Sequence, residues 1–139
     1  MNVDINYIGV IVAMLSSLVV GSIWYARAVF GKSWAKLAKV DMEKNKDNVF
    51  KPIVATIVVS LITAYVLAHV TYLSNSYFQN SYLQDALSTA LWLWLGLTAA
   101  RFITHDAFEG RPAKLTIINI GNEFTTIMLM GLIIGLFGK

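Results

Sequence analysis

The sequence predicts an all-α polytopic membrane protein: a bundle of four transmembrane helices, with a short interfacial helix after the first span. Of its 139 residues, 57% are hydrophobic and only 14% are charged, whereas soluble domains usually carry about a quarter charged residues. The apolar residues form four runs, each long enough to cross a hydrocarbon layer of about 30 Å. We expect one transmembrane domain over 1–139, with spans at about 5–26, 52–71, 83–103 and 113–137.

The composition excludes several kinds of site. The chain has no cysteine and two histidines, so neither a disulfide nor a thiolate metal site can form. No nucleophile elbow, H-E-x-x-H motif or phosphate-binding loop is present. His105 and Asp106 are adjacent, but no further ligand is close by, so we expect a helix-end cap in a solvated turn. We predict no catalytic residue, metal or cofactor, and no nucleic-acid partner.

Small side chains recur at a spacing that suits close helix contact. Ala13, Ser17 and Gly21 lie four residues apart in the first span, and Gly131 and Gly135 have the same spacing in the fourth. Such rows let another helix approach the backbone closely. We expect both rows to pack against helices of this chain or of a partner.

The connection 27–51 holds seven of the eleven Lys and Arg residues. Ser33 could cap a short helix over 32–40 that lies in the membrane surface, with Trp34 toward lipid and its lysines toward water. A solvated loop is the alternative, and we favour it for 41–48. The expected anchors at the membrane surfaces are aromatic and basic: Trp24, Tyr25, Trp34, Arg27 and Arg101.

Turn signals separate the second span from the third. Pro52 marks a helix start, because a proline in the first turn loses no intrahelical hydrogen bond. The segment 72–82 is rich in Ser, Asn, Gln and Tyr and has no Lys or Arg, so we expect a loop there. Ser81 followed by Gln84 fits a capping box at the start of the third span.

The third span has a short charge-free core, 86–100. If it crosses the bilayer, Asp85 and Arg101 lie near opposite surfaces. Trp92 and Trp94 then lie near mid-membrane, where a buried indole N–H needs an acceptor.

One face of the fourth span is polar. Its residues follow the i, i+3, i+4, i+7 spacing of a single helix face: Asn119, Asn122, Glu123 and Thr126. A charged side chain near the midplane costs at least about 2.5 kcal/mol on insertion scales, so we expect this face to point into the bundle or an oligomer interface. Depth counting adds two residues from other spans to the polar layer: Ser17 and Thr63.

Two roles are open for Glu123. Protonated, it is a neutral hydrogen-bond donor that can join helices. Ionised, it needs a cation or water, as in a proton- or cation-coupled pathway. Intramembrane carboxylates usually serve a function, but one acid with no basic partner at the same depth also fits a polar helix clamp.

The basic residues predict the orientation in the membrane. The connections 27–51 and 101–114 hold ten of the eleven Lys and Arg residues, and the connection between the second and third spans holds none. By the positive-inside rule, the two basic loops face the cytoplasm and both termini face outward.

The two halves of the chain can be aligned as a repeat. Residues 51–57 match 111–117 in Pro, Thr and Ile only, which shared topology explains as well as duplication does. In that alignment Thr63 occupies the position of Glu123.

Several positions form one combined pattern. They are Gly21-x-x-Trp24-Tyr25-x-x-x-x-Phe30-Gly31-x-x-Trp34, then Asn119 and Gly121 in the fourth span, and Gly131 and Gly135 near its end. In this pattern the sequence resembles a family of small four-helix bacterial membrane proteins classed as a domain of unknown function. The resemblance implies the same topology in a bacterial inner membrane, and it assigns no activity and no functional residue.

Two functions fit these observations. The first is a small transporter or channel subunit, a homo-oligomer whose pathway is lined by Glu123 and the polar layer. The second is a non-catalytic interaction protein, such as an assembly factor or accessory subunit, that binds membrane partner helices through 13–21 or 131–135. The lipid bilayer is a partner in both, and we favour transport because intramembrane carboxylates are usually functional.

Overall fold

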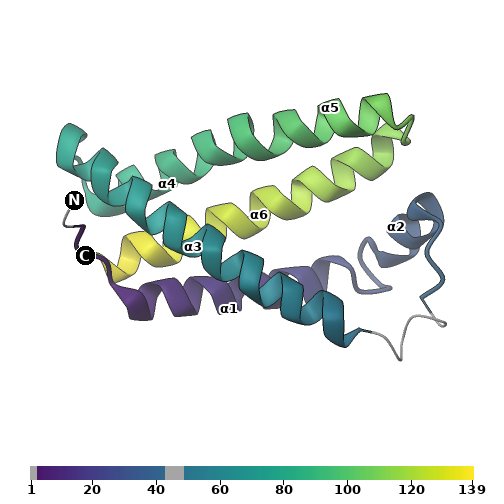
Figure 1. The fold of residues 1–139 in the computed structure, drawn as a ribbon, viewed down its shortest axis with the longest axis horizontal. Coiled ribbons are helices and arrows are strands. Elements are labelled where there is room, and N and C mark those ends of the chain that lie inside the picture. Colours follow the sequence, from purple (N-terminus) through teal and green to yellow (C-terminus); the bar gives the residue numbers. More distant parts are fainter. Residues whose placement is uncertain (1–2, 43–48) are drawn as a thin grey trace.

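The computed structural model describes residues 3–42 and 49–139, and the regular structure within them is helical (Figure 1). The third long element is continuous and consists of two α-helices joined by a π-helix. The bounds are: α1 Tyr7–Trp24, α2 Gly31–Ala38, α3 Phe50–Phe78, α4 Tyr82–Leu93, the π-helix η2 Trp94–Ala99, α5 Ala100–Phe108 and α6 Ala113–Phe137.

The four long elements pack as an antiparallel bundle. α6 lies between α1 on one side and α4 on the other, and α3 packs against α1 and α4. Both termini lie at one end of the bundle, which we call the terminal end (Figure 1). α2 and the α5–α6 turn lie at the opposite end, which we call the basic end because the described parts of both basic connections are there.

All four long elements are apolar and long enough to cross a membrane. Their outward faces carry large exposed apolar side chains, such as Val58, Ile62 and Leu97. Lipid tails are as apolar as these side chains, so such faces suit contact with a bilayer. The structure confirms the predicted fold class, a bundle of four membrane-spanning helices with a short helix after the first.

The second span is longer than the sequence predicts. α3 begins at Phe50 and continues through most of the predicted loop 72–82 to Phe78. Pro52 is the third residue of α3 and still lies in the first turn, where its missing N–H costs nothing. The predicted loop is therefore reduced to the three residues 79–81.

A buried aspartate explains this extension. Asp85, near the start of α4, is 1% exposed and accepts hydrogen bonds from Asn75 Nδ2 (2.8 Å) and Asn80 Nδ2 (3.0 Å). A partner on another helix thus satisfies the amide of Asn75 inside α3. Ser81 caps α4 by accepting a hydrogen bond from the backbone N–H of Gln84 (3.3 Å), as the capping-box pattern predicts.

Replacing Asp85 by Ala should destabilise the fold by about 2 kcal/mol, because Asn80 loses its acceptor and the buried Asn75 amide keeps only the carbonyl oxygen of Asn80 (2.9 Å). The free energy of unfolding can be measured by SDS titration in mixed micelles. Asp4→Ala removes an exposed acid and should change this free energy by less than about 0.5 kcal/mol. Equal effects of the two substitutions would contradict the role of Asp85 in joining α3 to α4.

The third span also extends beyond its charge-free core. α4, η2 and α5 together cover 82–108, against a predicted 83–103. A buried aspartate lies near each end, Asp85 and Asp106, and roughly 21 steps of 1.5 Å place them about 31 Å apart. This separation is close to the thickness of a hydrocarbon layer. Arg101, predicted near the second surface, is exposed within α5.

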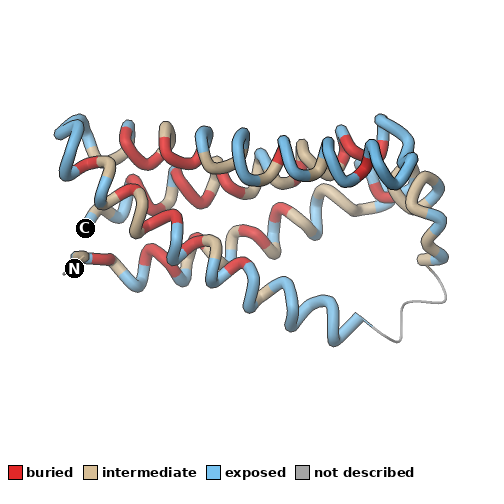
Figure 2. The backbone as a smooth tube through the Cα atoms, turned by 45° about the horizontal axis from the view of Figure 1, so that its top comes forward, coloured by how far each residue is buried: buried red, intermediate tan, exposed pale blue. Residues whose placement is uncertain are grey.

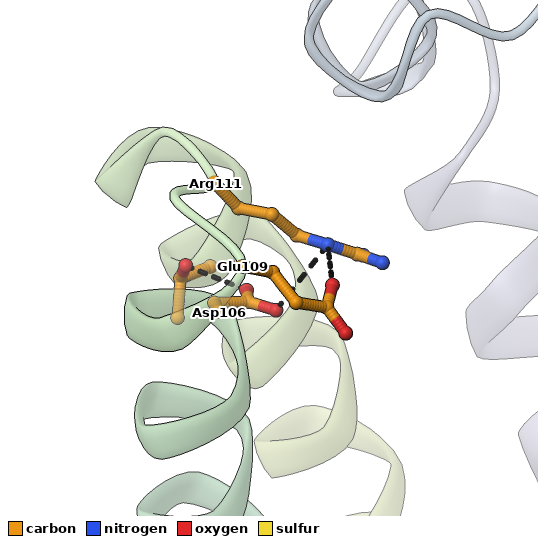
Figure 3. Close-up of polar contacts among 4 residues, drawn as sticks. Asp106, Glu109 and Arg111 are labelled. Carbon is orange, nitrogen blue, oxygen red and sulfur yellow. Dashed lines mark hydrogen bonds and ion pairs between the residues drawn. The ribbon is translucent and has the colours of Figure 1, made fainter.

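Asp106 stabilises the turn between α5 and α6 (Figure 3). Thr116 Oγ1 donates a 2.6 Å hydrogen bond to Asp106 Oδ2. Arg111 Nε lies 3.7 Å from Asp106 Oδ1 and 2.6 Å from Glu109 Oε2. The prediction of a solvated turn is wrong for Asp106, which is 4% exposed because it binds the first turn of α6.

The buried core lies toward the terminal end of the bundle. Residues from all four long elements form it, including Val10, Ala64, Leu67, Ala90 and Met130. In α3 the buried residues begin at Ser60, whereas 50–56 are all exposed (Figure 2). α3 therefore diverges from the other helices toward the basic end, and this divergence makes room for a groove.

Candidate functional site

A groove of about 800 Å³ lies between α1, α3 and α6, where α3 diverges. Its lining begins near the basic end at Tyr25 and Val49 and reaches Ile127 and Met130, which belong to the core. It extends from Val49, the residue before α3, to Thr63 within α3, roughly 14 steps or about 21 Å. This α1–α3–α6 groove therefore covers more than half the thickness of a hydrocarbon layer.

The groove brings together most of the predicted polar layer. Five of its six predicted members line the groove: Ser17, Thr63, Asn122, Glu123 and Thr126. The sixth, Asn119, is connected to the groove through Tyr25, whose hydroxyl lies 3.3 Å from Asn119 Oδ1. Residues from three helices thus meet at one site.

Most hydroxyl groups of the groove already donate hydrogen bonds within the protein. Ser17 Oγ and Ser60 Oγ are 2.8 Å apart and join α1 to α3. Thr56 and Thr63 each donate to a carbonyl oxygen one turn earlier on α3. The polar atoms that remain without partners are therefore concentrated on α6.

Glu123 is the one carboxylate among the described residues that line the groove, and Lys, Arg and His are absent from that lining. Its side chain is partly buried. Within 3–42 and 49–139 it accepts no hydrogen bond and forms no ion pair. A carboxylate removed from water is costly unless it is paired or neutralised. Glu123 therefore needs a proton, a cation or water from the groove.

Asn122 precedes Glu123 and lines the same groove. It is 7% exposed, and its Nδ2 is buried without a hydrogen-bond partner. Such an unsatisfied donor costs about 1–3 kcal/mol. Adjacent residues of α6 beside the groove therefore carry one unpaired donor, which is buried, and one unpaired acceptor.

Aromatic residues hold α2 and the end of α1 against α6. Trp24 Nε1 donates to the carbonyl oxygen of Ile118 (3.1 Å), and Tyr25 donates to Asn119. The Trp34 ring lies edge-on to Tyr25, with ring centroids 5.2 Å apart. Trp34 therefore packs on Tyr25 and stays partly exposed, because α2 folds back toward α6.

Tyr25 directly follows the last residue of α1. Burial raises the pKa of its hydroxyl to about 12, and the nearby carboxylate of Glu123 adds to this increase. Tyr25 therefore stays protonated at neutral pH and remains a hydrogen-bond donor at the groove.

Gly121 is a packing residue that sequence reasoning missed. A Cβ at this position would lie 3.1 Å from Cζ2 of the Trp24 indole. The Trp24 indole also lies close to Phe30, with ring centroids 4.7 Å apart. The combined pattern of tryptophan and glycines was visible in the sequence, but the contact across two distant helices was not.

The two tryptophans of the third span lie in different environments. Trp94, the first residue of η2, donates from Nε1 to the carbonyl oxygen of Ile120 on α6 (3.0 Å) and packs edge-on against Phe124. Trp92 is 68% exposed and points away from the bundle. The acceptor expected for a buried indole is therefore present for Trp94 and is a backbone group.

The predicted packing row of α1 is divided between two environments. Ala13 and Ser17 are buried in the bundle. Gly21 lines the groove, as Ser17 also does, but a Cβ built at Gly21 would meet no atom within 4 Å.

The predicted packing row of α6 contacts α4. A Cβ at Gly131 would lie 2.8 Å from Ala90 Cβ, and one at Gly135 would lie 2.8 Å from Leu83 Cα. Only a residue without a side chain permits so close an approach. This row is thus covered by the chain itself.

A second cavity, of about 390 Å³, lies beside α5 at the basic end, and Arg101 and His105 are part of its lining. Its acids Asp106 and Glu109 are already paired with Arg111. The predicted anchor Arg27 is exposed in the turn after α1. In the described parts of the chain, no three His, Asp or Glu side chains form a group that could hold a metal ion. The α1–α3–α6 groove is therefore the candidate site.

Comparison with known proteins identifies a family. The model of a family described as "Protein of unknown function (DUF1761)" matches residues 8–135. No curated protein and no solved structure matches the chain. The matched range contains the segment 21–34 and every polar residue of the groove. The chain therefore belongs to the DUF1761 family.

Proposed function

We propose that this protein is a small membrane transporter subunit in which Glu123 binds a proton or a cation that enters through the α1–α3–α6 groove. The observation that carries the proposal is the position of Glu123, which lines the groove and has no partner among the described residues. A structural clamp would instead place the carboxyl group against a polar group of a neighbouring helix. An acid left open to a groove suits reversible binding better than it suits helix packing.

The groove is closed on one side. Toward the terminal end, the Ser17–Ser60 contact is followed by tightly packed residues such as Ala64 and Leu67. A bound cation therefore cannot pass directly toward the terminal end, and the proposed entry is from the basic end. Passage to the other side would require α3 to move relative to α1 and α6, as in alternating access. Four helices leave little room for a transport pathway within a single subunit, so the proposed active form is a homo-oligomer.

The proposal includes an orientation in a bacterial inner membrane. By the positive-inside rule the basic end faces the cytoplasm, and both termini face outward. The groove then opens to the cytoplasm, and the cation enters it from that side.

Single-cysteine variants test this orientation, since the chain has no cysteine of its own. Thr56→Cys in the groove should react with a membrane-impermeant maleimide at least about tenfold faster than Val58→Cys, because a thiol must contact water to form the reactive thiolate. Val58 lies on the exposed apolar face of α3 and serves as the matched control. Labelling is compared in right-side-out and inverted vesicles. Equal rates, or labelling of Thr56→Cys from the outer side alone, would contradict a groove open to the cytoplasm.

The proposed activity can be tested with wild-type protein in liposomes loaded with the pH-sensitive dye pyranine. A gradient of Na⁺, K⁺ or an organic ammonium ion is imposed across the membrane. We expect at least one of these gradients to drive proton counterflow above the rate of protein-free liposomes. Identical dye traces with and without protein, for all three cations, would overturn the proposal.

The alternative function, a non-catalytic interaction protein, depends on packing rows that remain free for a partner. The row at Gly131 and Gly135 is covered by α4. The row of α1 is free only at Gly21, which lies in the groove. These contacts favour transport over partner binding.

A further inference from the structure

The unpaired atoms of the groove define the ligand that it can bind. Glu123 supplies a carboxylate, Thr126 a hydroxyl, and Asn122 an Nδ2 donor without a partner, which is buried and meets a ligand once the amide turns toward the groove. The Ser17, Ser60, Thr56 and Thr63 hydroxyls already have partners within the protein. A complementary ligand therefore carries a positive charge for Glu123 and a hydrogen-bond acceptor for Asn122.

The walls around these two residues are largely apolar. Val59, Ile127 and Met130 line the groove beside them, and the volume of about 800 Å³ lies within the range of small-molecule sites. The groove offers a desolvated inorganic cation one carboxylate, and its other oxygens are neutral hydroxyl and amide groups, several of them already hydrogen-bonded within the protein. An organic ammonium needs only one counter-charge and covers its remaining surface with its own carbon atoms.

We propose that the α1–α3–α6 groove binds an organic ammonium compound that also carries a hydroxyl or carbonyl oxygen, with the cation at Glu123, the oxygen at Asn122 Nδ2 and the apolar part against Val59 and Met130. This inference names the substrate class of the proposed transporter and rests on that function. The same chemistry occurs in a free amino alcohol and in an ammonium lipid headgroup. Either source would enter from the basic end, where Val49 and Tyr25 line the groove.

The test uses two matched probes and purified protein in dodecyl maltoside, a detergent without charge. Benzyldimethyl(2-hydroxyethyl)ammonium carries both features, and benzyltrimethylammonium lacks the hydroxyl. Calorimetric titration should show the first binding about fivefold more tightly, which is the contribution of one hydrogen bond. Equal affinities for the two probes in the wild-type protein would overturn the inference.

Variants assign each contact. Glu123→Gln should weaken both probes by about tenfold or more, whereas Asn122→Ala should remove only the preference for the hydroxyl probe. Asn122→Ser is a smaller change with the same expectation, in case the Ala variant fails to fold. Thr125→Val is the control, because Thr125 donates to the carbonyl of Gly121 and is not part of the lining. An Asn122 variant that weakens both probes alike would indicate a structural role and overturn the assignment.

Two further measurements separate the sources and the functions. Added phosphatidylethanolamine should compete with the probe if a lipid headgroup is the natural occupant, and should leave probe affinity unchanged if a free ammonium compound is. Probe binding without any flux in liposomes would support the site and overturn transport. Flux that depends on Glu123 without probe binding would support transport and overturn the substrate class.

Discussion

Replacing Gly131 by Leu should lower the free energy of unfolding by about 3 kcal/mol, the upper end of the range for overpacked cores. A Cβ alone would lie 2.8 Å from Ala90 Cβ and 3.1 Å from the carbonyl oxygen of Ala86. Neither neighbour can move aside, since Ala90 has no further side-chain torsion and the Ala86 contact is with the backbone. SDS titration and size-exclusion chromatography of the solubilised protein measure the loss.

Gly21→Leu is the matched control for this substitution. A Cβ at Gly21 meets no atom within 4 Å, so we expect a change of less than about 1 kcal/mol. A Gly131→Leu protein with wild-type stability that no longer associates with other copies would contradict the packing of α6 on α4. It would then favour the function in partner binding.

Replacing Glu123 by Gln should abolish cation-driven proton flux in liposomes. Gln keeps the size and polarity of Glu but can neither release a proton nor carry a negative charge. No other described residue of the groove lining is an acid that could replace it. We therefore expect pyranine traces that match protein-free liposomes, a loss of at least about tenfold, with an unchanged elution profile of the purified protein.

Glu109→Gln controls for the loss of a carboxylate as such. Glu109 is exposed in the α5–α6 turn and pairs with Arg111 outside the groove, so its variant should keep wild-type flux. If Glu123→Gln also transports at the wild-type rate and with the same pH dependence, Glu123 does not carry the proton.

The sequence predicted the parts of the fold that depend on local composition. Four apolar runs and the basic segment after the first were sufficient to predict four spans and a short helix, because bilayer thickness constrains helix length. The end of α3 could not be predicted in this way. Asn75 looked like a loop residue, and only its contact with Asp85 makes it suitable for a helix.

For the candidate site, too, the sequence predicted the arrangement within one helix but not the contacts between helices. Helical periodicity grouped Asn122, Glu123 and Thr126 on one side of α6, and all three line the groove. It could not show that α1 and α3 form the facing walls, or that Asn119 turns to Tyr25. Periodicity also could not predict the hydrogen bonds that the indole N–H groups of Trp24 and Trp94 donate. Their acceptors are backbone carbonyl oxygens, which any residue would provide.

The π-helix Trp94–Ala99 determines the direction in which the side chains of α5 point relative to those of α4. A π-type turn contains one residue more than an α-helical turn, so a regular α-helix through this segment would rotate α5 by about 100° relative to α4. Asp85 and Asp106 could then no longer both reach their partners. The π-type turn therefore acts as one extra residue that the third span has absorbed: deleting one residue within 94–99 would restore a regular α-helix with both aspartates in phase, whereas straightening the segment at constant length would not.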